Sequence, residues 1–162
     1  MGVVMMSWLI AVPMLGVTTG LRTLTPMAVL CWFAWLGYLP VEGTWAAWTS
    51  RLGVTVGFTV LALGELVADK LPRVPNRTSA GPLLARLGMG GLVGAIAATA
   101  MDGPGVEGVM LAVVGALVGA FAGFMIRRDV VTNLGCPDWP IALTEDAIAI
   151  LMAGFALHVV TG

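Results

Sequence analysis

The stretch from Leu52 to Leu71, LGVTVGFTVLALGELVADKL, indicates the fold class of this chain. It is long enough to cross a bilayer, for which a helix needs ~20 apolar residues. Glu65 and Asp69 close the apolar run and lie four residues apart, so they share one face of a helix. A charged side chain at membrane depth costs about 2.5–3.5 kcal/mol and therefore usually faces a partner or an aqueous pathway. The pair predicts a charged cluster inside a helical membrane protein.

The composition of the whole chain supports this class. Of the 162 residues, 59% are hydrophobic and only 10% are charged, whereas a soluble domain is about 25% charged. A net charge of −1 supplies no basic field for nucleic acid. The two cysteines and one histidine have no metal-ligand spacing, so neither a metal nor another cofactor is predicted. The chain is expected to form one transmembrane domain over residues 1–162.

Apolar segments divide the chain into six candidate spans, which gives an all-α, polytopic fold. They cover Val3–Val17, Pro26–Leu39, Leu52–Ala68, Leu84–Met101, Val106–Ile126 and Ile141–Val160. The first two are too long together for a single crossing at ~1.5 Å per residue. They form either two short passes or one helix broken at depth. Thr25 before Pro26 resembles a helix N-cap followed by a proline at the first helical position.

Basic residues predict the orientation of these spans, because they concentrate on the cytoplasmic side. They lie at Arg22, in the Lys70–Arg86 connection and at Arg127-Arg128, which alternate with more acidic connections. Six spans then give a multi-pass protein with the basic connections inside and both termini outside. Halves 1–72 and 84–162, joined by a basic cytoplasmic loop, would have opposite orientations, as in the inverted repeats of many transporters.

Glycines at four-residue spacing predict very close helix contacts. They occur as Gly53/Gly57, Gly90/Gly94 and Gly115/Gly119/Gly123. Two interpretations are open: tight packing within one bundle, or a homodimer through glycine-rich helices. Tryptophans fall near predicted interfaces, and Val41–Arg51 is expected to be a short interfacial helix that carries Trp45 and Trp48.

Several strings in the chain resemble one family of membrane proteins. They are GLRTLTP at 20–26, LGELVADKLP at 63–72, PNRT at 75–78, Arg86, and TED at 144–146. Together they resemble the small bacterial integral membrane proteins of domain of unknown function family 4126. The resemblance covers nearly the whole chain and implies a compact helical protein of the inner membrane. It implies no activity and no catalytic residue.

The candidate site gathers charged and polar residues that the expected topology places on one membrane side. Its members are Arg22, Thr25, Glu65, Asp69, Lys70, Arg77, Glu145 and Asp146. Arg22 needs a carboxylate or phosphate partner, because a guanidinium stays charged at any relevant pH. We expect Glu65 to be the main partner, since it lies one turn deeper than Asp69. Asp69 is alternatively solvated and paired with Arg73, and the whole cluster is alternatively a structural staple.

These residues favour a small transporter or channel over an enzyme, because no nucleophile with a partner histidine and no phosphate-binding motif occurs. The expected substrate is a small ion or polar solute, with proton coupling through Glu65. The alternative is a non-transporting scaffold or accessory subunit. Water-filled access to Glu65 distinguishes the two: a transporter needs it and a staple does not. The expected partners are lipid, a second copy of the chain and the small solute, with no nucleic acid.

Overall fold

The computed structural model describes residues 2–69, 79–135 and 138–161, and this part of the chain is helical without a strand. Its elements are α1 (Gly2–Leu21), α2 (Thr25–Trp35), the 3-10 helix η1 (Trp45–Ser50), α3 (Leu52–Ala68), α4 (Ala80–Ala100), α5 (Gly105–Leu134) and α6 (Asp138–Thr161). The all-α prediction is therefore confirmed.

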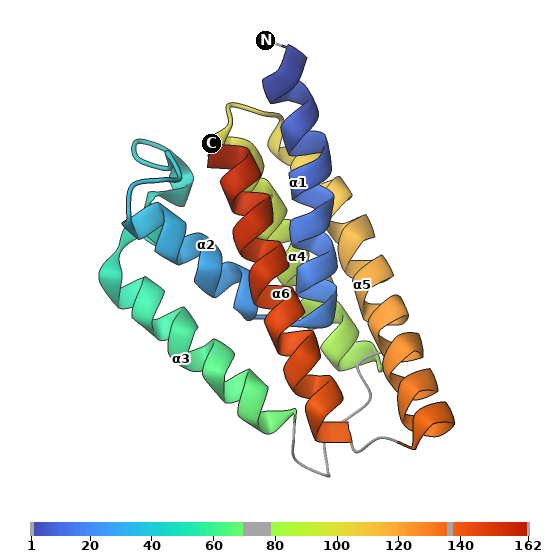
Figure 1. Ribbon diagram of the computed structural model, residues 1–162. Helices are drawn as coiled ribbons and strands as arrows, with labels where there is room; N and C mark the ends of the chain where they lie inside the picture. Colours follow the sequence, from blue (N-terminus) through green and yellow to red (C-terminus); the bar gives the residue numbers. More distant parts are fainter. Residues whose placement is uncertain (1, 70–78, 136–137, 162) are drawn as a thin grey trace.

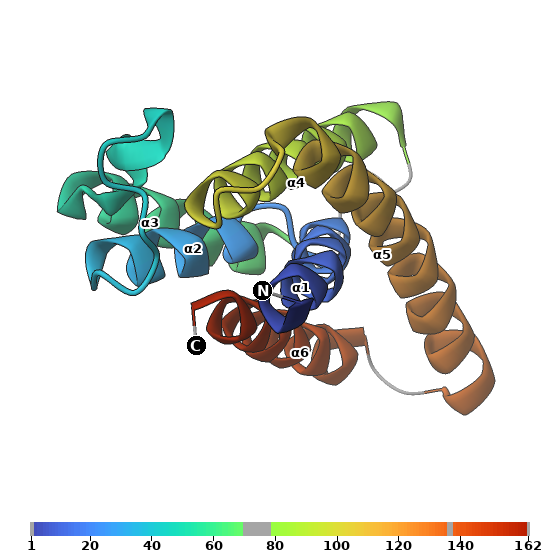
Figure 2. The ribbon, with the colours of Figure 1, turned by 90° about the horizontal axis from the view of Figure 1, so that it is seen from above.

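Helix α1 is the centre of the bundle (Figures 1 and 2). It packs against α4, α5 and α6, while α2 and α3 form a pair at one side that reaches the bundle mainly through α2 and α6. Successive helices run in opposite directions, so α1 begins and α6 ends on the same side of the molecule. The ends of α3 and α5 and the starts of α4 and α6 lie on the opposite side. This is the alternation that the basic connections predict.

Close packing of α1 on α5 and of α4 on α5 depends on glycine. A Cβ atom at Gly16 or Gly20 of α1 would overlap the backbone of α5, and one at Gly115 or Gly119 would overlap the backbone of α1. Gly94 of α4 has the same relation to α5. Small residues let helix backbones approach where lipid removes the hydrophobic drive for association. The glycine row of α5 therefore packs within the chain, as does Gly90/Gly94. Only Gly53/Gly57 has open space around both positions.

Three of the described helices are long and apolar enough to cross a membrane: Ala80–Ala100, Gly105–Asn133 and Trp139–Thr161. The apolar helices Trp8–Leu21, Thr25–Trp35 and Leu52–Ala68 are shorter than this. Helix α2 has 11 residues, about 16 Å at ~1.5 Å per residue, roughly half of a ~30 Å hydrocarbon core. The six predicted segments thus exist as helices, but the second is too short to span unaided.

In the described part of the chain, apolar side chains cover the surface of α5 and a charged side chain is buried inside, as expected for a protein in lipid. Large apolar side chains are exposed along α5, at Val106, Met110, Val114, Val118, Phe121, Met125 and Ile126. The buried core of α4, α5 and α6 is built mostly from alanine and glycine. One of the largest fully buried side chains in the described part of the chain is charged: Arg22. A buried charge is more informative than an exposed apolar residue, and it marks the candidate site.

The segment after α2 forms the short helix that the sequence predicts. Thr44 caps η1 by accepting a hydrogen bond from the Ala46 N–H at 3.1 Å. Trp45 is exposed and donates from its indole to Thr99 on α4 at 3.0 Å. Trp48 packs against Phe58 of α3. The segment thereby connects the α2–α3 pair to the end of α4.

The two halves of the chain differ in how their helices pack. They run in opposite directions, as an inverted repeat requires. In an inverted repeat, α4 would correspond to α1 and α2 to α5. However, α1 packs extensively along α5, whereas α4 makes only a small contact with α2. The two halves therefore have the opposite directions that an inverted repeat requires, but their helix contacts are not equivalent.

Candidate functional site: a charged helix break

The candidate site is built around a break between α1 and α2. Helix α1 ends at Leu21 and α2 begins at Thr25, so Arg22, Thr23 and Leu24 connect them. Pro26 has no N–H with which to bond the carbonyl of Arg22, so a continuous helix through Arg22 would lack this bond. The chain therefore forms two separate helices joined by a three-residue turn. Leu24, not Thr25, occupies the N-cap position, and it has no side-chain capping bond.

A carboxylate from α3 closes the start of α2 instead. Glu65 accepts hydrogen bonds from the Thr23 N–H at 2.7 Å and from the Leu24 N–H at 2.8 Å, one on each oxygen. These amides belong to the positive end of a helix, where a negative charge is stabilising. The sequence-based expectation that Glu65 is the main partner of Arg22 is wrong, because both oxygens of Glu65 accept from backbone amides within the turn.

A guanidinium from α4 closes the end of α1. Arg86 donates from Nη1 to the carbonyl of Gly20 at 2.5 Å and to that of Leu21 at 2.9 Å. Arg86 is buried, with 4% of its surface exposed. These carbonyls are the negative end of α1 and lack helical partners. The sequence does not indicate this role: Arg86 belongs to a basic connection and to the family strings, and neither predicts a cap for another helix.

Arg22 lies in the turn itself and is 0% exposed. It forms ion pairs with Asp69, just after α3, and with Asp146 of α6. The predicted buried cluster of Arg22 with carboxylates is thus confirmed, with these two aspartates as its partners. Asp69 is not simply solvated, because its side chain is 12% exposed and contacts Arg22. The turn is held from α3, α4 and α6 together.

Two polar atoms at the turn have no hydrogen-bond partner within the described part of the chain. They are Nε of Arg22 and the hydroxyl oxygen of Thr25, and both are buried. Lone buried polar groups of this kind are rare in native proteins and commonly indicate a water, an ion or a functional role. Thr25 is therefore at the site, though not as a helix cap.

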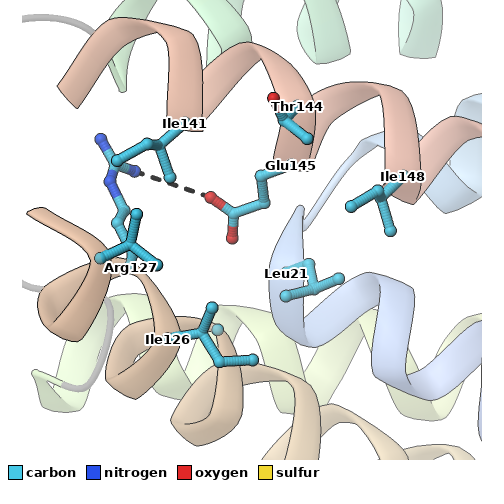
Figure 3. A pocket seen from close by; sticks show the side chains of 9 residues that line it. Leu21, Ile126, Arg127, Ile141, Thr144, Glu145 and Ile148 are labelled. Atoms are coloured by element: carbon cyan, nitrogen blue, oxygen red, sulfur yellow. Dashed lines mark ion pairs between the residues drawn. The ribbon is translucent and has the colours of Figure 1, made fainter. Parts of the chain in front are cut away.

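The remaining predicted residues lie elsewhere. Glu145 pairs with Arg127 of α5, with 3.7 Å between the closest nitrogen and oxygen (Figure 3). This ion pair borders a groove of about 410 Å³ between α5 and α6, whose lining includes Leu21 of α1. Lys70 and Arg77 lie outside the described residues. Within that part of the chain, no three Asp, Glu, His or Cys side chains are placed to hold a metal ion.

The cap on α2 gives a direct prediction. Replacing Glu65 by alanine should lower the free energy of unfolding by about 0.5–2 kcal/mol, the usual effect of losing a helix cap. It should also speed hydrogen exchange at the amides of Thr23 and Leu24, measured by mass spectrometry in detergent. Glu107→Ala is the matched control, because Glu107 is an exposed carboxylate in the first turn of α5. Equal exchange at residues 23 and 24 in both variants would contradict the cap.

The fold and the site define the class of the protein: a helical protein of membrane character with a buried, charge-capped helix break. The chain belongs to the family described as domain of unknown function (DUF4126), whose model matches residues 9–160. This confirms the resemblance drawn from the sequence strings. No curated protein and no solved structure matched the chain.

Proposed function

We propose that the protein is a small membrane transporter or channel for a small ion or polar solute, with the helix break as its polar site. The observation that carries this proposal is the pair of buried polar atoms, Arg22 Nε and Thr25 Oγ1, that lack a described hydrogen-bond partner at the break. A solute that accepts from the guanidinium and bonds the hydroxyl would satisfy both. Interrupted helices are common binding elements of secondary transporters.

The energetics of the cluster support a role beyond stability. Removing charges from water is costly, and apolar replacements of a buried ion pair are often neutral or stabilising by about 1–4 kcal/mol. A chain that needed only a stable bundle would gain little from Arg22, Asp69 and Asp146. Ionisable residues inside a membrane protein are accordingly a functional hypothesis by default. In this proposal, protonation of Glu65 weakens its two bonds to the backbone and couples proton movement to opening of the turn.

The second candidate is a non-transporting scaffold or accessory subunit. It is favoured by a specific observation: Glu65 and Arg86 bind the two helix ends, and the groove near the break is lined by neither Arg22 nor Glu65. In that case the cluster is a staple that holds α1 and α2 at their angle. The two functions differ in whether a polar solute reaches Thr25.

The proposal also covers the location of the protein in the cell and its oligomeric state. We place the protein in the bacterial inner membrane with the basic connections in the cytoplasm and both termini in the periplasm. A single chain of this size offers little room for a pathway, so we propose a homodimer. Gly53 and Gly57 are its candidate contact, because a Cβ at either position meets nothing within 4 Å.

A pair of threonine variants tests the function. The purified protein is reconstituted in liposomes, and proton, sodium, potassium and chloride fluxes are followed under imposed gradients. Thr25→Val keeps the shape of the side chain and removes the hydroxyl, so flux should fall about tenfold, the effect of a hydrogen bond worth ~1.4 kcal/mol. The melting temperature should stay the same or rise, because an unsatisfied buried hydroxyl is removed.

Thr55→Val is the matched control. The Thr55 hydroxyl is also buried, but it bonds the carbonyls of Cys31 at 3.3 Å and Arg51 at 3.2 Å. This variant should be less stable by about 0.5–1.5 kcal/mol and keep its flux. A folded wild-type protein without flux of any of these ions would overturn ion transport. Equal fluxes in wild type and Thr25→Val would exclude the break as the site.

A further inference from the structure

The groove between α5 and α6 lies beyond the last residue of α1. Both helices pack against α1, which ends at Leu21, whereas α5 continues to Leu134. In the described part of the chain, no helix fills the space between them past Leu21, and the groove of about 410 Å³ opens there (Figure 3). This volume is within the range of ligand pockets, ~300–1,000 Å³. The groove therefore exists because α1 is shorter than the helix beside it.

The lining of the groove is mostly apolar, and its polar groups are engaged by the protein itself. The residues without a polar side chain are Leu21, Gly123, Ile126, Val130, Ile141 and Ile148. Thr144 donates to the carbonyl of Pro140 at 2.9 Å. Arg127 and Glu145 pair with one another, and neither is a free charge. An enclosed water needs about two to four polar partners, which these engaged groups do not supply. An occupant of the groove is therefore held by apolar contacts.

The groove opens on the surface that α5 presents to lipid. Ile126 and Ile148 line it and are 63% and 45% exposed. Ile126 also ends the series of exposed apolar side chains on α5 that begins at Val106, a length of about 30 Å at ~1.5 Å per residue. This equals the ~30 Å thickness of a hydrocarbon core. The mouth of the groove is thus continuous with the lipid-facing surface and within reach of the acyl chains of the adjacent leaflet.

We propose that this groove binds one acyl chain of a membrane phospholipid. The acyl chain lies between Ile126 and Ile148, reaches Leu21, and fills the space past the end of α1. An empty apolar space would cost its lining the dispersion contacts that a hydrocarbon chain supplies. The site recognises the acyl chain and not the headgroup, because its polar groups are engaged within the protein. It does not depend on the proposed transport, since Arg22 and Thr25 are not part of the lining.

A photoreactive lipid tests the occupant. The protein is reconstituted with phosphatidylglycerol that carries a diazirine on one acyl chain, extracted into detergent, washed and irradiated, and the cross-linked residues are mapped by mass spectrometry. Cross-links should concentrate on Ile126, Val130 and Ile148, with only background at Val114, which is exposed on α5 outside the groove. Labelling of Val114 equal to that of the groove would overturn the site.

A second lipid tests recognition of the acyl chain. Native mass spectrometry should count one retained lipid per protein chain, equally for phosphatidylglycerol and for phosphatidylethanolamine with the same acyl chains. A preference of about tenfold for either headgroup, the discrimination that one lost hydrogen bond gives, would overturn the assignment to the acyl chain.

Matched isoleucine variants locate the lipid. Ile148→Trp fills the groove and should abolish both the retained lipid and the groove cross-links. Ile150→Trp is the control and should keep them, because Ile150 is equally exposed on α6, at 46% against 45%, and lies outside the lining. Ile126→Trp from the facing helix replaces Ile148→Trp if the latter does not fold. Equal lipid retention in the groove-filling and control variants would exclude the groove. A change from dimer to monomer in Ile148→Trp alone would assign the groove to a second copy of the chain and overturn the lipid.

Discussion

Replacing Arg22 by methionine is expected to lower the free energy of unfolding by about 3–5 kcal/mol, the usual effect of breaking a buried ion pair by removing one partner. The loss arises because Asp69 and Asp146 would both lose the guanidinium between them. A thermal melt in detergent, followed by circular dichroism, measures the change. Exposed Arg128 supplies the matched control: Arg128→Met removes an arginine that pairs on the surface with Asp129 and should cost no more than ~1 kcal/mol.

Double-mutant cycles identify the partners of Arg22. Arg22→Met combined with Asp146→Asn should show a coupling of about 0.5–3 kcal/mol, as should the cycle with Asp69→Asn, because contacting residues are not additive. The cycle with Glu65→Gln should show a smaller coupling, since Glu65 bonds the backbone of Thr23 and Leu24. Additive effects of Arg22 and both aspartates would contradict the ion pairs, and a larger coupling for Glu65 would restore the sequence-based assignment.

Gly119→Leu is also expected to lower the free energy of unfolding strongly. A Cβ at Gly119 would overlap the carbonyl of Val17 on α1, and backbone cannot move aside as a side chain can. Overpacking a core typically costs about 1–3 kcal/mol, and here α1 would have to separate from α5. The melting temperature in detergent should fall and the yield of folded protein should drop. Gly57→Leu on α3 is the matched control, because nothing lies within 4 Å of a Cβ there.

The Gly57 control also bears on assembly. If Gly57→Leu leaves the melting temperature unchanged but shifts a dimer to a monomer in size-exclusion chromatography with light scattering, α3 carries the proposed homodimer contact. An unchanged size with an unchanged melting temperature would place this face against lipid alone. An unchanged melting temperature for Gly119→Leu would contradict the close contact of α1 and α5.

The sequence predicted those features that depend on spacing along the chain. Apolar runs of the right length identify helices whatever surrounds them. The threonine-proline pair at 25–26 predicts an interruption because proline lacks a donor. The basic connections place Arg22 on the same side as Asp69 and Asp146, so a buried cluster could be expected before its partners were known. Glycine at four-residue spacing likewise predicted a close neighbour for α5.

Only the tertiary structure decided which groups meet. Glu65 and Asp69 are four residues apart on one helix face, so spacing cannot tell which of them reaches Arg22. The packing of α3 beside α2 gives the ion pair to Asp69 and the backbone amides to Glu65. Arg86 reaches the end of α1 because α4 packs beside it. The glycine row of α5 meets α1 and not a second chain. Helical periodicity places side chains on a face of their own helix, whereas the helix that this face meets depends on the packing of the whole bundle.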